Sequence, residues 1–523
     1  MIHRQIHILR DPWIPLDQNG QEELASVVEL LTGSKDAPDL LHPRDDYRFF
    51  ARMLLSSLVQ ALFEPENEAE IEARIAHPMS LREVEDRIAE VEDDFWLVHP
   101  EPRKGFLQTA KAVEKKDKAE GLSVDALDSL AESHLLYRRL SRRPAVCATC
   151  AVCALYGLQA TARSAGSGFV PSIRGGAPMS TLLSLGADKD RSVRADVWVN
   201  VLARTVLPRF ELTRSTGNPW VQKARSVPRK PHRFMVAEGL LWQPRALRMV
   251  AHEQGTCSSC GRRMEILFAA SGVHPGVESV QGESAFFAHP YCPTVKPGKH
   301  LSTPGNTPFW CSIGEVLPGL TNERNDKGDA APVVLHQVAT DRTHGLLLLE
   351  IASNNAKILH VIHESLGLPR QLRIDYRATA RRLVARAANA LKDIRTALVP
   401  SAAKNHGQRS RSHDKAVAIP SRLRKLELPD VDSAFWQRTE EPFFCALRHA
   451  SDSASELLFC REVNAVALEL FEWHVAPYLD DARTALRVAR ARVSLRRNLI
   501  KTLSLNGHPA SGVPGGVSVS LLS

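Results

Sequence analysis

The sequence lacks the features of a secreted, membrane-spanning or disulfide-stabilised protein. Nine cysteines in 523 residues are too few for a disulfide scaffold, and a cytosol would keep them reduced. The N-terminus "MIHRQIHILRDPWIPL" has no apolar run long enough for a signal peptide. No window approaches the roughly 20 apolar residues of a membrane span. We therefore expect a cytoplasmic protein without a membrane partner.

The common catalytic motifs are missing as well. The chain has no GxxxxGK[ST] loop, which makes nucleotide hydrolysis unexpected, and no GxSxG nucleophile elbow. Its 20 histidines are scattered and form no HExxH motif. We therefore predict that the protein is not an enzyme, and keep a nuclease or hydrolase with a diffuse active site only as an alternative.

Positive charge is concentrated toward the C-terminus. Residues 371–430 hold fourteen Arg or Lys against five Asp or Glu, and residues 483–501 hold seven against none. Such density is typical of a polyanion-binding surface, although a solvated basic helix face or a subunit-docking face would look the same. The candidates for non-specific DNA contacts are Arg483, Arg487 and Arg490.

The pattern of hydrophobic residues changes near residue 376. Before it, short strand-like and helical segments alternate with loops; after it, long stretches have helical period, at 376–398, 432–451, 453–476 and 479–504. We predict an α+β fold with a large mixed α/β N-terminal domain (1–375), which bears a zinc knuckle-like site. A C-terminal four-helix bundle (376–506) and a flexible tail (507–523) follow.

Two CxxC pairs are the strongest chemical signal. Cys147 and Cys150 form one, and Cys257 and Cys260 in "GTCSSCGRR" form the other. Zinc prefers four soft ligands in a tetrahedron, and each CxxC turn presents two thiolates to one ion. Ordinary buried thiols are an alternative, as is a redox pair, which would need a thioredoxin-like βαβ unit that we do not find. We predict a structural Zn2+ that joins two distant segments.

Three cysteines compete for two places in the first pair, because the stretch reads "CATCAVC". A helix is expected to begin near Cys150. Cys153 then lies among apolar residues, as a core thiol would, whereas Cys147 and Cys150 lie at the entry to the helix. We therefore choose Cys147 and Cys150 as ligands.

A glycine-rich stretch follows at 164–178, "SAGSGFVPSIRGGAP". Small residues allow a backbone to approach a ligand closely. Arg174, followed by two glycines, suits contact with a phosphate or a groove, although an ordinary glycine-rich turn explains the stretch equally well.

Ten motifs, in order along nearly the whole chain, resemble the large subunit of the type I-E CRISPR surveillance complex Cascade, the CasA family. They are "DPWIPL", "LHPRDDYRFFA", "GFLQT", the first CxxC with its helix, "GSGFVPSIRGGAP", "GLLWQP", "GTCSSCG", "HPYCPTVK", "SNNAKIL" and "HVAPYL". The resemblance implies a non-catalytic subunit for antiviral defence, with a mixed α/β domain and a four-helix bundle.

The resemblance also implies partners and a role. Such subunits recognise the protospacer-adjacent motif on double-stranded DNA through the minor groove, promote R-loop formation with the guide RNA, and recruit a helicase–nuclease. They assemble with backbone, small, RNA-end-binding and processing subunits. A stand-alone zinc-containing nucleic-acid-binding regulator is the alternative that charge and cysteines alone would support.

Three reading elements of the family have counterparts here. The glycine loop matches Gly166, Ser167 and Gly168, with serine where glycine is familiar; the lysine finger has no lysine, and His274 is the candidate. The strand-separating wedge lacks its glutamine and matches Asn354, Asn355, Ala356 and Lys357. The family loop that docks on the guide RNA and backbone subunits matches Tyr137, Arg138, Arg139, Arg142 and Arg143, unless these side chains are simply solvated.

Overall fold

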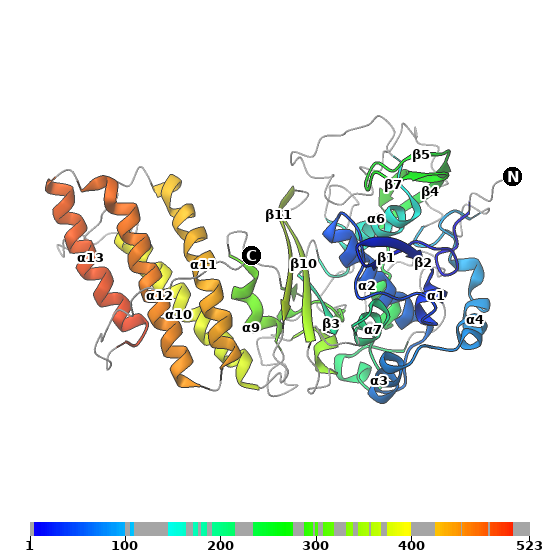
Figure 1. Ribbon diagram of the computed structural model, residues 1–523, viewed down its shortest axis with the longest axis horizontal. Coiled ribbons are helices and arrows are strands. Elements are labelled where there is room, and N and C mark those ends of the chain that lie inside the picture. Colours follow the sequence, from blue (N-terminus) through cyan, green and yellow to red (C-terminus); the bar gives the residue numbers. More distant parts are fainter. Residues whose placement is uncertain are drawn as a thin grey trace. The chain divides into compact units, whose positions relative to one another are not determined.

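The computed structural model describes seventeen stretches of the chain. They are residues 5–99, 105–108, 145–163, 171–175, 179–185, 191–214, 234–275, 287–296, 299–301, 307–317, 331–337, 344–354, 357–367, 374–398, 424–450, 452–479 and 482–505. Within them, strands and helices coexist in an α+β fold, as predicted (Figure 1). None of the described helices is long and apolar enough to cross a membrane.

The chain divides into two compact units. Unit 1 comprises Met1–Gly305 and Glu315–Ile374, and unit 2 comprises Asn306–Gly314 and Asp375–Ser523. The main boundary at Ile374 lies beside the position expected from the sequence. The short segment Asn306–Gly314 was expected in the N-terminal domain, but it belongs to unit 2.

Unit 1 is built around two buried helices. Their bounds are α2 (Asp45–Leu62) and α6 (Ala148–Ala160). Two aspartates in the first turn of α2 suit the positive end of its dipole, and all of its residues except Asp45 and Arg48 are buried. Gly157 of α6 meets the Phe50 ring of α2 so closely that a Cβ would come within 2.6 Å of it. The Ser57 and Tyr156 hydroxyls also share a hydrogen bond of 3.1 Å, so the two helices are fixed against each other.

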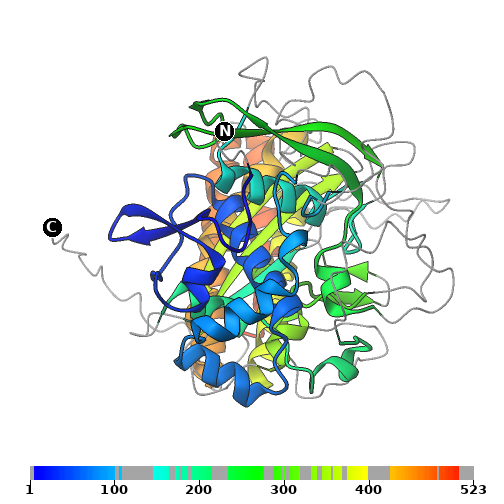
Figure 2. The ribbon, with the colours of Figure 1, turned by 90° about the vertical axis from the view of Figure 1, so that its right-hand side faces the viewer.

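The remaining elements of unit 1 surround this pair. The β4–β7 ribbon is antiparallel and lies beside α6, and β1–β2, β5–β6 and β8–β9 form further two-stranded ribbons (Figures 1 and 2). Their bounds are β1 (Ile14–Gln18), β2 (Gln21–Ala25), α1 (Val27–Leu31), α3 (Glu68–Ala76), α4 (Leu81–Ala89), α7 (Val193–Val199), α8 (Val236–Leu240), β4 (Arg245–His252), β5 (Gly255–Thr256), β6 (Arg263–Met264), β7 (Leu267–Pro275), β8 (Thr294–Lys296) and β9 (Lys299–His300).

A three-stranded antiparallel sheet carries the longest hairpin of the described residues. Its order is β11-β10-β3, with bounds β3 (Ser180–Leu185), β10 (His344–Asn354) and β11 (Lys357–Gly367). The β10–β11 pairing runs from Gly345 opposite Gly367 to Asn354 opposite Lys357. Because β10 is hydrogen-bonded on both edges, it is the fixed centre of the sheet.

The described residues of unit 2 form a bundle of four long helices. They are α10 (Ile374–Leu398), α11 (Arg424–Arg448), α12 (Ser453–Val475) and α13 (Ala482–Thr502), and Figure 1 shows them alongside one another. Arg382 and Arg386 of α10 both pair with Glu456 of α12, and Arg395 pairs with Asp432 of α11. Asp393 accepts a 2.7 Å hydrogen bond from Thr502 of α13, so α10 touches all three partners.

The segment Asn306–Gly314 packs against this bundle through the side chain of Trp310. Trp310, 1% exposed, lies with its ring 4.5 Å from Phe443 and 5.3 Å from Trp436, centroid to centroid. Arg377 of α10 donates a 3.1 Å hydrogen bond to the carbonyl of Gly314, the second residue of α9 (Ile313–Val316). Each aromatic pair contributes about 0.5–1.5 kcal/mol beyond its buried area, which explains why the segment joins unit 2.

Candidate functional site

The N-terminus of α6 presents the first cysteine pair. Cys147 is the N-cap residue in extended conformation, and its carbonyl accepts the first helical hydrogen bond, from Ala151 N–H at 2.8 Å. Residues three apart lie on one side of a helix, so Cys150 turns to the same side one turn later. Val146 bridges to Phe268 of β7, which fixes the entry of the chain into α6.

A tight turn between β5 and β6 presents the second pair. Cys257 N–H donates to the Arg262 carbonyl at 2.7 Å, and Gly261 N–H to the Cys257 carbonyl at 3.0 Å. Gly261 has a φ of +76°, a left-handed conformation that favours glycine. Ser258 N–H donates to the Ala145 carbonyl at 3.0 Å, so the turn is held against the chain just before α6.

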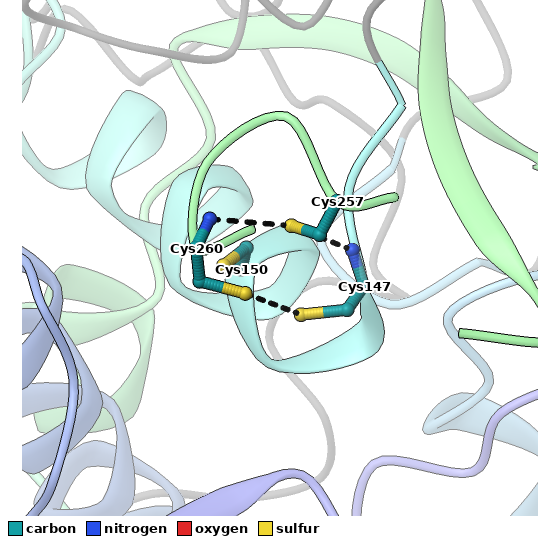
Figure 3. Close-up of side chains that lie close together, drawn as sticks. All are labelled: Cys147, Cys150, Cys257 and Cys260. Atoms are coloured by element: carbon teal, nitrogen blue, oxygen red, sulfur yellow. Dashed lines mark hydrogen bonds between the residues drawn. The ribbon is translucent and has the colours of Figure 1, made fainter. Parts of the chain in front are cut away.

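The four sulfur atoms of Cys147, Cys150, Cys257 and Cys260 converge (Figure 3). All lie within 4.8 Å of one another, and Cys147 Sγ is 3.7 Å from Cys260 Sγ. A tetrahedron with Zn–S bonds of about 2.3 Å places its sulfurs about 3.8 Å apart, so the arrangement has the size of a zinc site. The structure thus brings together the four cysteines chosen from the sequence, and among the described residues this is the one cluster of its kind.

The thiols influence one another strongly. Hydrogen bonds from the Cys147 and Cys150 thiols lower the pKa of Cys260 to about 5, and the same contacts lower the pKa of Cys257. The pKa values of the donors Cys147 and Cys150 are in turn raised. Thiolates are the form in which cysteine binds metal. Cys153 lies outside the cluster on the next turn of α6, and burial raises the pKa of its thiol.

Arg174 has a structural environment. The side chain is 3% exposed, and its guanidinium donates to the Ala160 carbonyl at 2.6 and 3.0 Å and to Ser180 Oγ. Ala160 ends α6, so the cation caps the carboxyl end of that helix. This environment contradicts the prediction that Arg174 contacts a phosphate or a groove, because the side chain is enclosed and its donors are taken.

The other predicted nucleic-acid contacts fall into three groups. Asn354 and Lys357 are backbone partners in the last pair of the β10–β11 hairpin, and His274 is paired with Ala246 in the β4–β7 ribbon. Arg483, Arg487 and Arg490 lie on α13, where the side chains of the last two are exposed. Outside the described residues lie Tyr137, Arg138, Arg139, Arg142, Arg143, Gly166, Ser167, Gly168, Asn355 and Ala356.

Two side chains at the cysteine cluster were not predicted. His42 Nε2 lies 3.2 Å from Cys150 Sγ, and Arg262 Nε donates to Cys260 Sγ at 3.2 Å. The sequence offered a signal for Arg262, which stands two positions after Cys260. It offered none for His42, because only the fold brings that residue to the cluster.

Comparison with known proteins identifies the family of this chain. The family model for CRISPR-associated protein Cse1 matches residues 8–506. The fold is similar to Thermus thermophilus CasA (Cse1), with 16% identity, a TM-score of 0.68, and 95% of this chain and 99% of that chain covered. Cse1 from Acidimicrobium ferrooxidans gives 15%, 0.66, 96% and 99% in the same order.

A third similar chain belongs to a structure described as a CRISPR RNA-guided surveillance complex. It is 14% identical, with a TM-score of 0.64, and 94% of this chain and 99% of that chain are covered. At such low identities, the similarity to solved structures shows only a shared fold. The family model matches nearly the whole chain, and this match shows the family. The chain therefore belongs to the Cse1 family, also called CasA, the large subunit of the type I-E CRISPR Cascade complex.

Proposed function

We propose that this non-catalytic, cytoplasmic subunit recognises the protospacer-adjacent motif on double-stranded DNA through the minor groove and helps to open the duplex for the guide RNA. The observation that carries the proposal is the β10–β11 hairpin, whose end coincides with the segment that resembles the family wedge. Guide pairing reads the target, and the protein reads only the short motif and the DNA shape. The minor-groove code is degenerate, so tolerance of several motifs is expected.

The hairpin is suited to hold its tip in place. Each strand has 11 residues, and β10 is also paired with β3 on its other edge. Leu346, Leu348 and Ile351 of β10 are buried, at no more than 3% exposure. A hairpin whose last described pair, Asn354 and Lys357, belongs to a packed sheet can resist the force of separating two DNA strands. Asn354 and Lys357 would then flank the residues that enter the duplex.

The four-cysteine cluster is proposed to hold a structural zinc ion. The sulfur spacing fits a tetrahedral zinc site with four cysteine ligands. A bound ion would supply folding free energy by tying the turn of β5–β6 to α6. That connection matters for function because the segments on either side of α6 carry the proposed docking loop and glycine loop.

The family match supports a proposal for the partners. We propose that the loop with Tyr137, Arg138, Arg139, Arg142 and Arg143 docks on the guide RNA and the backbone subunits. The small, RNA-end-binding and processing subunits complete the assembly, and the helicase–nuclease is recruited to it. Gly166, Ser167, Gly168 and His274 are the proposed motif readers, together with the hairpin tip.

Omission of this subunit tests the proposal. Cascade reconstituted without the chain is expected to lose motif-dependent binding of duplex targets, measured by gel shift, and to keep pairing with single-stranded targets. Specific binding typically exceeds non-specific binding by about 10³–10⁷, so the loss should be large. The regulator alternative expects the opposite: sequence-specific duplex binding by the isolated chain, with no change in the complex that lacks it.

The exposed arginines of α13 are proposed to bind DNA without sequence preference. Charge reversal by Arg487→Glu and Arg490→Glu should lower low-salt affinity and reduce the slope of log K against log salt by about 2, since each phosphate contact contributes about 0.9. The charge-matched control reverses Arg448 and Arg461, exposed on α11 and α12. Unchanged target binding at low salt by the α13 variant would remove this role.

A second candidate role for α13 is protein docking. Leu486, Val493 and Ile500, spaced by seven residues, are 55%, 58% and 42% exposed. An apolar stripe with this spacing and basic flanks fits a partner helix that carries its own apolar stripe between acidic residues. Replacement of the three residues by serine would then weaken subunit assembly without changing the salt slope.

A further inference from the structure

Hydrogen-bond donors approach the cysteine cluster from several directions. Cys257 Sγ accepts hydrogen bonds from the backbone N–H groups of Cys147, at 3.3 Å, and of Cys260, at 3.5 Å (Figure 3). Donors also come from outside the four cysteines: His42 reaches Cys150, and Arg262 reaches Cys260, each at 3.2 Å. Within the described residues, the sulfurs of Cys150, Cys257 and Cys260 therefore each have an N–H group at hydrogen-bond distance, and for Cys150 and Cys260 a side chain supplies it.

The protonation of the His42 ring is fixed by its second contact. Arg44 N–H donates to His42 Nδ1 at 3.1 Å, so that nitrogen must present its lone pair. In a neutral imidazole the proton then sits on Nε2, the atom that faces Cys150. His42 is thus a donor to the sulfur and cannot offer Nε2 to a metal. The ring is 5% exposed and is tilted against Tyr47, with centroids 5.3 Å apart, so its orientation is held.

Arg262 places a positive charge next to the sulfur of Cys260. A zinc ion with four thiolates carries two net negative charges, and burial of such charge is costly without compensation. The Arg262 guanidinium contacts Cys260 Sγ and also forms an ion pair with Glu22 of β2. The same side chain therefore balances the cluster and joins it to the β1–β2 ribbon, which is far away in sequence.

We propose that His42 and Arg262 are positioning residues that hold the thiolates and retain the zinc ion, and that Glu22 supports Arg262 in this task. The inference rests on the zinc site proposed above. Zinc loading would then be connected to four separate segments: the β1–β2 ribbon, the segment before α2, the start of α6 and the β5–β6 turn.

The test measures zinc retention by the full-length chain in competition with a chromogenic chelator. His42→Leu and Arg262→Met should each weaken zinc affinity by about 10–100-fold, the usual effect of removing such supporting contacts. Glu22→Gln should have a smaller effect in the same direction. In the cobalt-substituted chain, the loss of an N–H···S bond should move the thiolate-to-metal charge-transfer band to longer wavelength, which a general loss of stability would not do.

Matched variants separate the loss of the His42 hydrogen-bond donor from the loss of packing around its side chain. His42→Gln, whose amide N–H can occupy the Nε2 position, should restore affinity; Arg263→Met and His252→Leu, at exposed neighbours of the turn, should bind like the unmodified chain. Unmodified affinity in both His42→Leu and Arg262→Met would overturn the inference and leave the zinc site standing. Equal weakness of His42→Gln and His42→Leu would overturn the donor role of His42. An unmodified chain without zinc would overturn both this inference and the site.

Discussion

Cys147→Ser is expected to lower the zinc content of the pure chain from about one ion to nearly none, because a structural site needs all four ligands. The serine itself should not disturb α6. Cys147 is the N-cap of that helix, and serine is a favoured N-cap residue. The loss measured by elemental analysis would therefore report on the missing thiolate and not on a broken helix.

Cys153 provides the control, because it stands one turn further along the same helix. Cys153→Ser should keep its zinc, although a buried hydroxyl can cost about 1–3 kcal/mol of stability if it finds no partner. Cys153→Ala avoids that cost and should keep both zinc and most of the stability. If Cys153→Ala lost zinc and Cys147→Ser retained it, the ligand assignment would move one helical turn and the geometry of Figure 3 would be wrong.

In the zinc-free form, the region where the cluster joins the start of α6 to the β5–β6 turn should also be much less stable. Structural zinc sites contribute about 10–16 kcal/mol of apparent binding free energy in small zinc-finger peptides. Unit 1 has a large core of its own, so we expect partial loss of structure around the β5–β6 turn and not complete unfolding. Hydrogen exchange of residues 255–264 would show it as faster exchange in Cys147→Ser than in Cys153→Ala.

Local patterns were sufficient to predict much of the fold. Helical periodicity predicted 376–398 and 453–476 to within two residues of α10 and α12, because each helix presents a regular apolar face. The cysteines were found for a similar reason, since each CxxC turn is a local arrangement. The helix predicted at 432–451 begins earlier, at Arg424.

What could not be predicted depends on contacts between distant residues. Asn306–Gly314 joins unit 2 because Trp310 packs among aromatic rings that lie more than a hundred positions later. Arg174 looked like a ligand contact because two glycines follow it, but its guanidinium turns inward to α6. His42 reaches Cys150 across 108 positions. In each case the neighbouring residues in the sequence do not reveal whether the side chain faces solvent or the interior, because its contacts are with distant residues.

Replacement of Asn355, Ala356 and Lys357 by glycine is expected to abolish R-loop formation on duplex targets and to spare targets melted in advance. The physical reason is the cost of the first opened base pairs, about 1.4 kcal/mol per step on average, which no guide pairing has yet repaid. A wedge at the end of the β10–β11 hairpin would lower this cost by occupying the space between the strands. A pre-melted target removes the cost, so the variant should bind it like the unmodified complex.

The matched control places glycine in the same hairpin away from its end, at Val361 and Ser365, whose side chains are exposed on β11. Glycine weakens a strand wherever it stands, so this variant reveals how much of the defect comes from a loosened hairpin. Normal R-loop formation by the control, measured by footprinting of the displaced strand, together with failure of the tip variant, would support the wedge. Equal failure of the tip variant on duplex and pre-melted targets would show instead that the segment serves assembly or guide binding, because strand separation is then no longer the step that it affects.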